Sequence, residues 1–155
     1  MSVIIQGTQL QAIEYGTRVD RAASALPQTA QTAYFTVTGG RVLIAAMLGE
    51  VTTVVQGQAT TVQLIATPTT GTAVNLSNST GDVNAKEVGA TVALASTLGG
   101  TLVVNNAGAT VLPLVNAFVV RTGTIDLKTA ASSTGATKWS LWYVPLDASA
   151  SVAAA

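Results

Sequence analysis

The stretch KWSLWYVPL, residues 138–146, has the alternation of a β-strand, but both of its faces are apolar. Side chains along a strand point alternately to opposite sides of the sheet. One face carries Trp139, Leu141 and Tyr143, and the other carries Trp142, Val144 and Leu146. A strand in a lone domain commonly hides one face and leaves a polar face in water. The second apolar face therefore needs a cover, either from the same chain or from another molecule.

Further runs of strand-forming residues extend from this stretch back to Thr32. The clearest is TIDLK (124–128), in which Ile125 and Leu127 are expected to point into the core. Its expected outward positions are Thr124, Asp126 and Lys128. The other predicted strands include RVLIAAML (41–48), EVTTVVQ (50–56), TTVQLIATP (60–68), ATVALAST (90–97), TLVVN (101–105), ATVLPLV (109–115) and AFVVR (117–121). About eight to ten short strands predict an all-β domain, as a β-sandwich, a jelly roll or a barrel-like fold.

Glycines mark the expected turns between these strands. Gly39 and Gly40 predict a tight turn before the run at 41–48. Gly49 is expected to separate that run from the one at 50–56, since an isolated glycine commonly interrupts a strand pattern.

The chain divides into three regions on this pattern. The β domain is expected to span residues 32–147, between an N-terminal arm at 1–31 and a flexible or extended C-terminal tail at 148–155. Apolar residues from Thr17 to Leu26 recur at helical spacing, so the arm is a candidate for a short helix there, which Pro27 would end.

Charged residues are scarce and unevenly distributed. They make up 9% of the 155 residues, against roughly 25% in typical soluble proteins, and the formal net charge is zero. No charged residue occurs in 51–81 or in 88–120. Such stretches are usually protected from water by a core or by a neighbouring molecule. A neutral chain also lacks the field that attracts nucleic acid or acidic lipid, so neither is an expected partner.

Residue types that carry catalysis or bind metals are few. The chain has no histidine and no cysteine, which excludes Ser–His and cysteine nucleophiles and removes the usual zinc ligands. One polar loop groups Asn78, Asp82, Asn84 and Glu87. Their spacing is not that of a calcium-binding EF-hand, and turn formation explains them. We therefore predict a protein that is not an enzyme, with no catalytic residue, no cofactor and no metal site.

No export or membrane signal stands out in the sequence. The first residues, MSVIIQGTQLQAIEYG (1–16), lack the positive start and long apolar segment of a signal peptide. VLIAAML (42–48) is among the longest apolar runs, and a membrane helix needs roughly 18 such residues. The expectation is a soluble protein without a cleaved signal.

Trp142 is the sharpest functional candidate, and three interpretations apply to it. The arm, as a helix over 17–26, can fold back over the indole; the indole can be an exposed sugar-binding platform; or it can lie in a subunit interface. Burying a tryptophan removes about 150–250 Å² from water, worth roughly 4–6 kcal/mol before ordering costs. We therefore predict a subunit interface formed by Trp142, Val144 and Leu146.

Two segments also resemble a known group of proteins. They are TGTIDLKTAASSTGATKWSLWYVPLDASASV (122–152) and GGRVLIAAMLGEVTTVVQGQATTVQLIATPTTG (39–71), a little under half of the chain. They look like the C-terminal and middle parts of small virion proteins of tailed bacteriophages, some of which are head decoration or cement proteins. The resemblance implies an all-β protein made in the host cytoplasm and present in many copies on the head surface of the virion, commonly as trimers or dimers.

Residues and resemblance together predict a non-enzymatic capsid decoration protein. It is expected to self-associate, as a homotrimer first and a dimer second, and to stabilise the head shell by binding the major capsid protein. The charged residues of the arm, Glu14, Arg18, Asp20 and Arg21, are its predicted capsid contacts. The alternatives are a structural component of the phage tail and a carbohydrate-binding module for host attachment.

Overall fold

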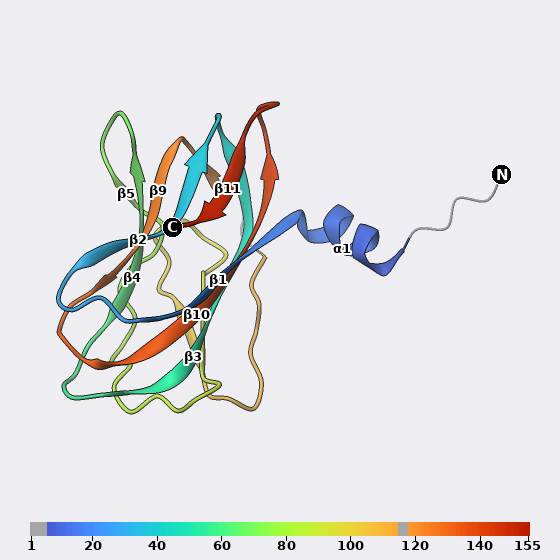
Figure 1. The fold of residues 1–155 in the computed structure, drawn as a ribbon. Coiled ribbons are helices and arrows are strands. Elements are labelled where there is room, and N and C mark those ends of the chain that lie inside the picture. Colours follow the sequence, from blue (N-terminus) through green and yellow to red (C-terminus); the bar gives the residue numbers. More distant parts are fainter. Residues whose placement is uncertain (1–5, 115–117) are drawn as a thin grey trace.

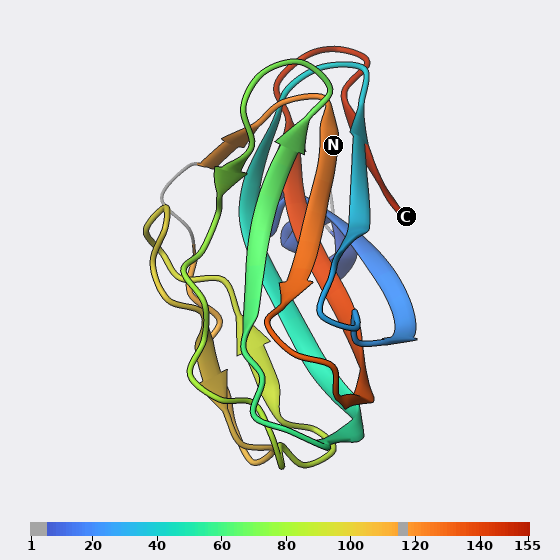
Figure 2. The ribbon, with the colours of Figure 1, turned by 90° about the vertical axis from the view of Figure 1, so that its left-hand side faces the viewer.

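The computed structural model describes residues 6–114 and 118–155 and shows two antiparallel sheets packed face to face (Figures 1 and 2). Sheet A has the order β1 (Thr17–Ala25), β10 (Thr134–Pro145), β3 (Val42–Gln56), β6 (Thr91–Ala93) and β7 (Val103–Asn105), and β8 (Phe118–Val120) also pairs with β3. Sheet B has the order β11 (Ser151–Ala154), β2 (Gln31–Thr38), β9 (Gly123–Thr129), β4 (Val62–Pro68) and β5 (Val74–Asn75). The predicted all-β class is confirmed: the domain is a sandwich of open sheets and not a closed barrel.

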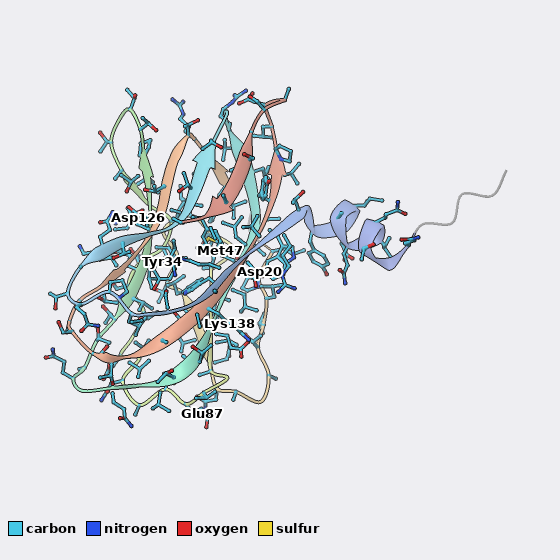
Figure 3. All side chains as sticks on the ribbon, in the orientation of Figure 1. Asp20, Tyr34, Met47, Glu87, Asp126 and Lys138 are labelled. Carbon is cyan, nitrogen blue, oxygen red and sulfur yellow. The ribbon has the colours of Figure 1, made fainter. Side chains whose placement is uncertain are left out.

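The inward face of β10 fills the space between the two sheets. Trp139, Leu141 and Tyr143 are buried, as the alternation predicted. The Trp139 ring meets the edge of Tyr34 from β2, with ring centroids 6.2 Å apart, and its Nε1 donates to Thr137 Oγ1 at 3.0 Å. Tyr34 and Met47 lie in this interior (Figure 3). The indole therefore ties sheet A to sheet B while its polar atom stays hydrogen-bonded.

Gly49 does not separate two strands, which corrects the prediction made from the glycine. The runs 41–48 and 50–56 belong to the single long strand β3. Gly49 lies opposite Trp139 in the β10–β3 pairing, and a Cβ atom on it would come 2.6 Å from the indole ring. The glycine is there to make room for the tryptophan, not to make a turn.

The helical interpretation of 17–26 is wrong, because this segment is the edge strand β1, paired with β10. Val19 packs partly buried against the core, whereas Ala22 and Ala23 lie exposed where the strand pairing is irregular. Alanine fits either structure, so the hydrogen bonds offered by β10 decide the outcome. The one helix among the described residues is α1 (Gly7–Tyr15).

The strands extend beyond the predicted domain limits of 32–147. β1 and the start of β2 lie in the predicted arm, and β11 turns the predicted tail into an edge strand of sheet B. Residues 1–5 of the arm lie outside the described residues. The predicted strand at 109–115 is absent over 109–114, where Pro113 has no N–H for a ladder, and residue 115 is not among those described.

Strand β9 follows its predicted alternation except in the environment of Asp126. Ile125 and Leu127 are fully buried between the sheets. Asp126 takes its predicted outward position on sheet B, but it is only 6% exposed. Gln31 Nε2 and Thr67 Oγ1 donate to its Oδ2 at 2.6 and 2.7 Å. Side chains from the neighbouring strands β2 and β4 thus cover the carboxylate.

A salt bridge joins the two turns at one end of the sandwich. Arg41, which follows the Gly39–Gly40 turn, donates from Nε and Nη2 to the carboxylate of Asp147 at 3.0 and 2.8 Å. The backbone N–H of Arg41 donates to the same carboxylate at 2.7 Å. These hydrogen bonds from Arg41 lower the pKa of Asp147 from 3.8 to about 2.

We expect this salt bridge to make stability depend on pH in acid. Between about pH 4 and about pH 2 the unfolded chain takes up a proton at Asp147 that the folded chain does not, so this contribution falls as the pH falls. Asp147→Asn should lower the urea midpoint slightly at neutral pH and flatten its decline over that window. Arg41→Gln, which restores an ordinary pKa at Asp147, is the matched control. If the urea midpoint of both variants falls with pH as steeply as that of the wild type, the salt bridge is not the cause of this pH dependence.

Candidate functional site

Several large apolar side chains lie at the surface of the described chain, and they are the strongest candidate for a functional feature. The exposed set is Leu10, Ile13, Val74, Val88, Leu98, Val111, Leu114, Val119, Val144 and Leu146. Seven of them fall in three places: Leu10 and Ile13 on α1, Val74, Leu98 and Val119 around a groove between the sheets, and Val144 and Leu146 at the end of β10 and just after it. Exposed apolar side chains that gather in one place mark interaction sites more often than isolated ones do.

Trp142 is half-buried, and its own chain supplies part of the cover. Arg18 of β1 lies opposite it in the strand pairing, with the guanidinium carbon 5.4 Å from the centre of the indole. Thr8, Gln11, Ala12 and Tyr15 of α1, with Leu112, line a hollow of about 480 Å³ beside the indole. One face of the ring is thus already stacked by a cation, which leaves less of it for a sugar.

The other predicted interface residues are exposed, but the face they belong to is mixed. Val144 is 42% and Leu146 45% exposed. The N-terminal half of the same face of β10 is polar, because Lys138 pairs with Glu50 at 3.0 Å and Ser140 donates to Asp20 at 2.6 Å. Only the C-terminal half of this face is therefore apolar.

The predicted capsid-contacting residues are not held on one projecting arm. Glu14 lies on α1, whereas Arg18, Asp20 and Arg21 belong to β1. Partial burial opposes ionisation of Asp20, but hydrogen bonds from Ser140 and Arg18 outweigh it and keep the pKa of Asp20 below its usual value. Arg21 packs 4.0 Å above the Tyr34 ring and donates to Ser24, so it is engaged within the chain.

The charged side chains on β1 suit its place at the edge of sheet A. An edge strand carries backbone groups that can pair with another chain, and charged side chains discourage such pairing. The Arg18–Asp20 pair, 2.7 Å apart, lies on this strand.

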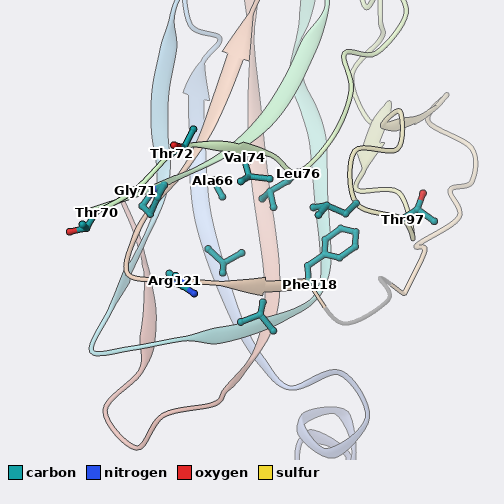
Figure 4. Close-up of a pocket in the computed structure, with 13 residues that line it drawn as sticks. Ala66, Thr70, Gly71, Thr72, Val74, Leu76, Thr97, Phe118 and Arg121 are labelled. Carbon is teal, nitrogen blue, oxygen red and sulfur yellow. The ribbon is translucent and has the colours of Figure 1, made fainter.

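A groove of about 600 Å³ opens between the edges of the two sheets (Figure 4). Its buried floor is formed by Leu76, Phe118 and Val120. Its exposed apolar rim consists of Val74, Leu98 and Val119. Sequence reasoning did not single out these residues, but they fall in the two uncharged stretches, 51–81 and 88–120. The lack of charge was the signal that could have found them.

The acidic side chains of the described residues do not gather into a metal-binding cluster. No group of three or more His, Cys, Asp or Glu side chains placed to hold a metal occurs among them. In the polar loop at 77–87, Asp82 Oδ1 accepts from the backbone N–H groups of Thr60 and Asn84, each at 2.9 Å, as a turn-forming aspartate does. Within the described ranges, no helix has the length and hydropathy that a membrane crossing requires.

Comparison with known proteins adds no relative, since no family model, no curated protein and no solved structure matches the chain. The molecule is a β-sandwich with apolar surface and a groove, features that can bind another macromolecule through burial and shape.

Proposed function

We propose that this protein is a non-enzymatic virion structural protein, a capsid decoration protein of a tailed bacteriophage that works as a homo-oligomer. It is made in the host cytoplasm, binds the major capsid protein on the head surface and stabilises the shell. The resemblance of residues 39–71 and 122–152 to small virion proteins gives the class. The exposed apolar side chains give the physical reason for assembly.

The observation that carries the proposal is the combination of scarce charge with apolar surface. A chain with 9% charged residues and zero net charge has little repulsion between copies. Its exposed apolar residues lose contact with water when copies or a capsid lattice cover them. Binding to a capsid lattice depends on surface contacts, so this role requires no catalytic group.

Solution mass tests the self-association directly. We expect light scattering at micromolar concentration to give a multiple of the 15.6-kDa chain mass, three-fold for a trimer or two-fold for a dimer. A stable monomer across that range would contradict the oligomer. Salt should change the mass little, because apolar burial, unlike ion pairing, is not screened.

Location on particles tests the rest of the proposal. Labelled antibodies against the protein should decorate the heads of purified virions at many sites. Heads stripped of the protein should open at lower temperature or lower ionic stress than intact heads. Label confined to the tail would favour the tail-component alternative. Absence from purified particles would overturn the proposal.

A further inference from the structure

Helix α1 presents its two largest aliphatic side chains away from the body of the protein, which is the reverse of an ordinary surface helix. Side chains three and four residues apart share a face of a helix. The face toward the body carries Thr8, Gln11, Ala12 and Tyr15, which line the hollow beside Trp142. The opposite face carries Leu10, Ile13 and Glu14, with Leu10 56% and Ile13 71% exposed. An amphipathic helix normally buries its apolar face, so this face is built for a surface other than the body of its own chain.

The placement of α1 agrees with that reading. The helix extends away from the sandwich, as Figure 1 shows, and none of its residues is buried. It ends at Gly16, which has a φ of 85°. A Cβ atom on Gly16 would come 2.3 Å from the carbonyl oxygen of Tyr143. Because Gly16 has no side chain, the connection between α1 and β1 can pass close to the backbone of β10. The backbone angles of Gly16 then set the direction in which α1 projects.

The groove between the sheets has the complementary chemistry. Its floor and rim are apolar, and its one charged lining residue is Arg121 (Figure 4). The one charged residue of α1 is Glu14. Leu10 and Ile13 thus offer two apolar anchors about one helical turn apart, next to the acidic Glu14. The groove offers an apolar surface lined at one point by the basic Arg121.

Helix α1 and the groove lie on opposite sides of their own chain. Across sheet A, Thr17 pairs with Tyr143, Tyr143 with Ile44, and Ile44 with Phe118. The helix therefore leaves from one side of this row and the groove opens at the other. The outer face of α1 also points away from the body that carries the groove.

We propose that α1 of one copy docks into the groove of the next, with Leu10 and Ile13 against Val74, Leu98 and Val119, and Glu14 against Arg121. This proposal rests on the self-association in the proposed function and names its surfaces. The contact is head-to-tail, because one copy gives its helix and the next gives its groove. Such contacts close into a ring when the rotation between copies allows it.

Complementation between two defective variants tests the proposal. Leu10→Asp/Ile13→Asp removes the helix anchors and leaves the groove. Val119→Asp, or Leu98→Asp as a second groove variant, removes the groove and leaves the helix. Each alone should weaken self-association on the order of 100-fold, because charges replace apolar anchors in the contact. Mixing a helix variant with a groove variant should restore a one-to-one pair, since one intact helix meets one intact groove.

A charge exchange provides an independent readout. Glu14→Arg and Arg121→Glu should each weaken association on the order of 10-fold, and the double variant should recover most of the loss. Val88→Asp, at a 55% exposed apolar position outside both surfaces, is the matched control and should leave association unchanged. All substituted side chains are exposed, so circular dichroism and melting temperature should stay close to those of the wild type.

The outcomes separate this inference from the proposed function. An oligomer that survives the helix and groove variants but dissociates with Val144→Asp places the interface on β10 and overturns the helix–groove contact alone. Loss of association without recovery on mixing also overturns it. A wild-type protein that is monomeric at micromolar concentration overturns the contact and self-association together, while labelling of virions still decides the location.

Discussion

Replacing Trp139 with alanine is expected to lower the free energy of unfolding by about 3–5 kcal/mol. The indole is 2% exposed, packs edge-on against Tyr34 and lies over Gly49. Its removal leaves a cavity at the centre of the sandwich that neither sheet can fill without moving. Urea unfolding followed by far-ultraviolet circular dichroism measures the loss without relying on tryptophan fluorescence.

Gly49→Ala turns this prediction into a thermodynamic cycle. In the wild type the added Cβ would come 2.6 Å from the buried ring, so we expect a cost of about 1–3 kcal/mol. In the Trp139→Ala background the ring is gone, and the same methyl group should cost much less or even stabilise. A coupling of at least about 1 kcal/mol between the two changes is the expected result. Strictly additive costs would show that Gly49 is needed for a reason other than the indole.

Replacing Asp126 with alanine is expected to destabilise the protein by about 2 kcal/mol. The carboxylate is 6% exposed, and Gln31 and Thr67 both donate to its Oδ2, so its removal takes away the acceptor that they share. Gln31 Nε2 then keeps its longer hydrogen bond to Thr67 Oγ1, at 3.2 Å. Oδ1 has no partner within the described residues.

Asp126→Asn is the matched control for this prediction. It keeps the shape and one oxygen for the two donors while it removes a buried charge, so its cost should stay below about 1 kcal/mol. Equal costs for asparagine and alanine would show that the negative charge, and not the hydrogen-bond geometry, stabilises this face. Urea midpoints at neutral pH give both values.

The local sequence pattern correctly predicted the strands that bury one face in the core and leave the other at the surface. Ile125, Leu127 and the Trp139 face of β10 were placed correctly because a period of two leaves one arrangement that buries them. Gly49 was misread because its reason lies on a partner strand, opposite Trp139. The segment 17–26 was a candidate for a short helix because the spacing of its apolar residues suits a helix, but the pairing with β10 makes it a strand.

The candidate site was only partly within reach of the sequence. Exposed apolar side chains were expected at Val144 and Leu146, and both are exposed. The groove could not be predicted, because Val74, Leu98 and Val119 are far apart in the chain and meet only through the sheet order. The outward face of α1 depends on the direction set at Gly16, which no periodicity encodes.

The order of strands in sheet A also constrains how the protein is made. Among the described residues, β10 is the strand that pairs with β1, so Thr17 cannot form its strand pairing until Tyr143 has been synthesised. While the ribosome translates the intervening residues, the nascent chain holds strands with no complete sheet to join. Chains dominated by pairings between residues far apart in sequence fold slowly and are prone to aggregate before folding is complete. Efficient production should therefore depend on chaperone capacity or low temperature during synthesis more than on any property of the finished sandwich.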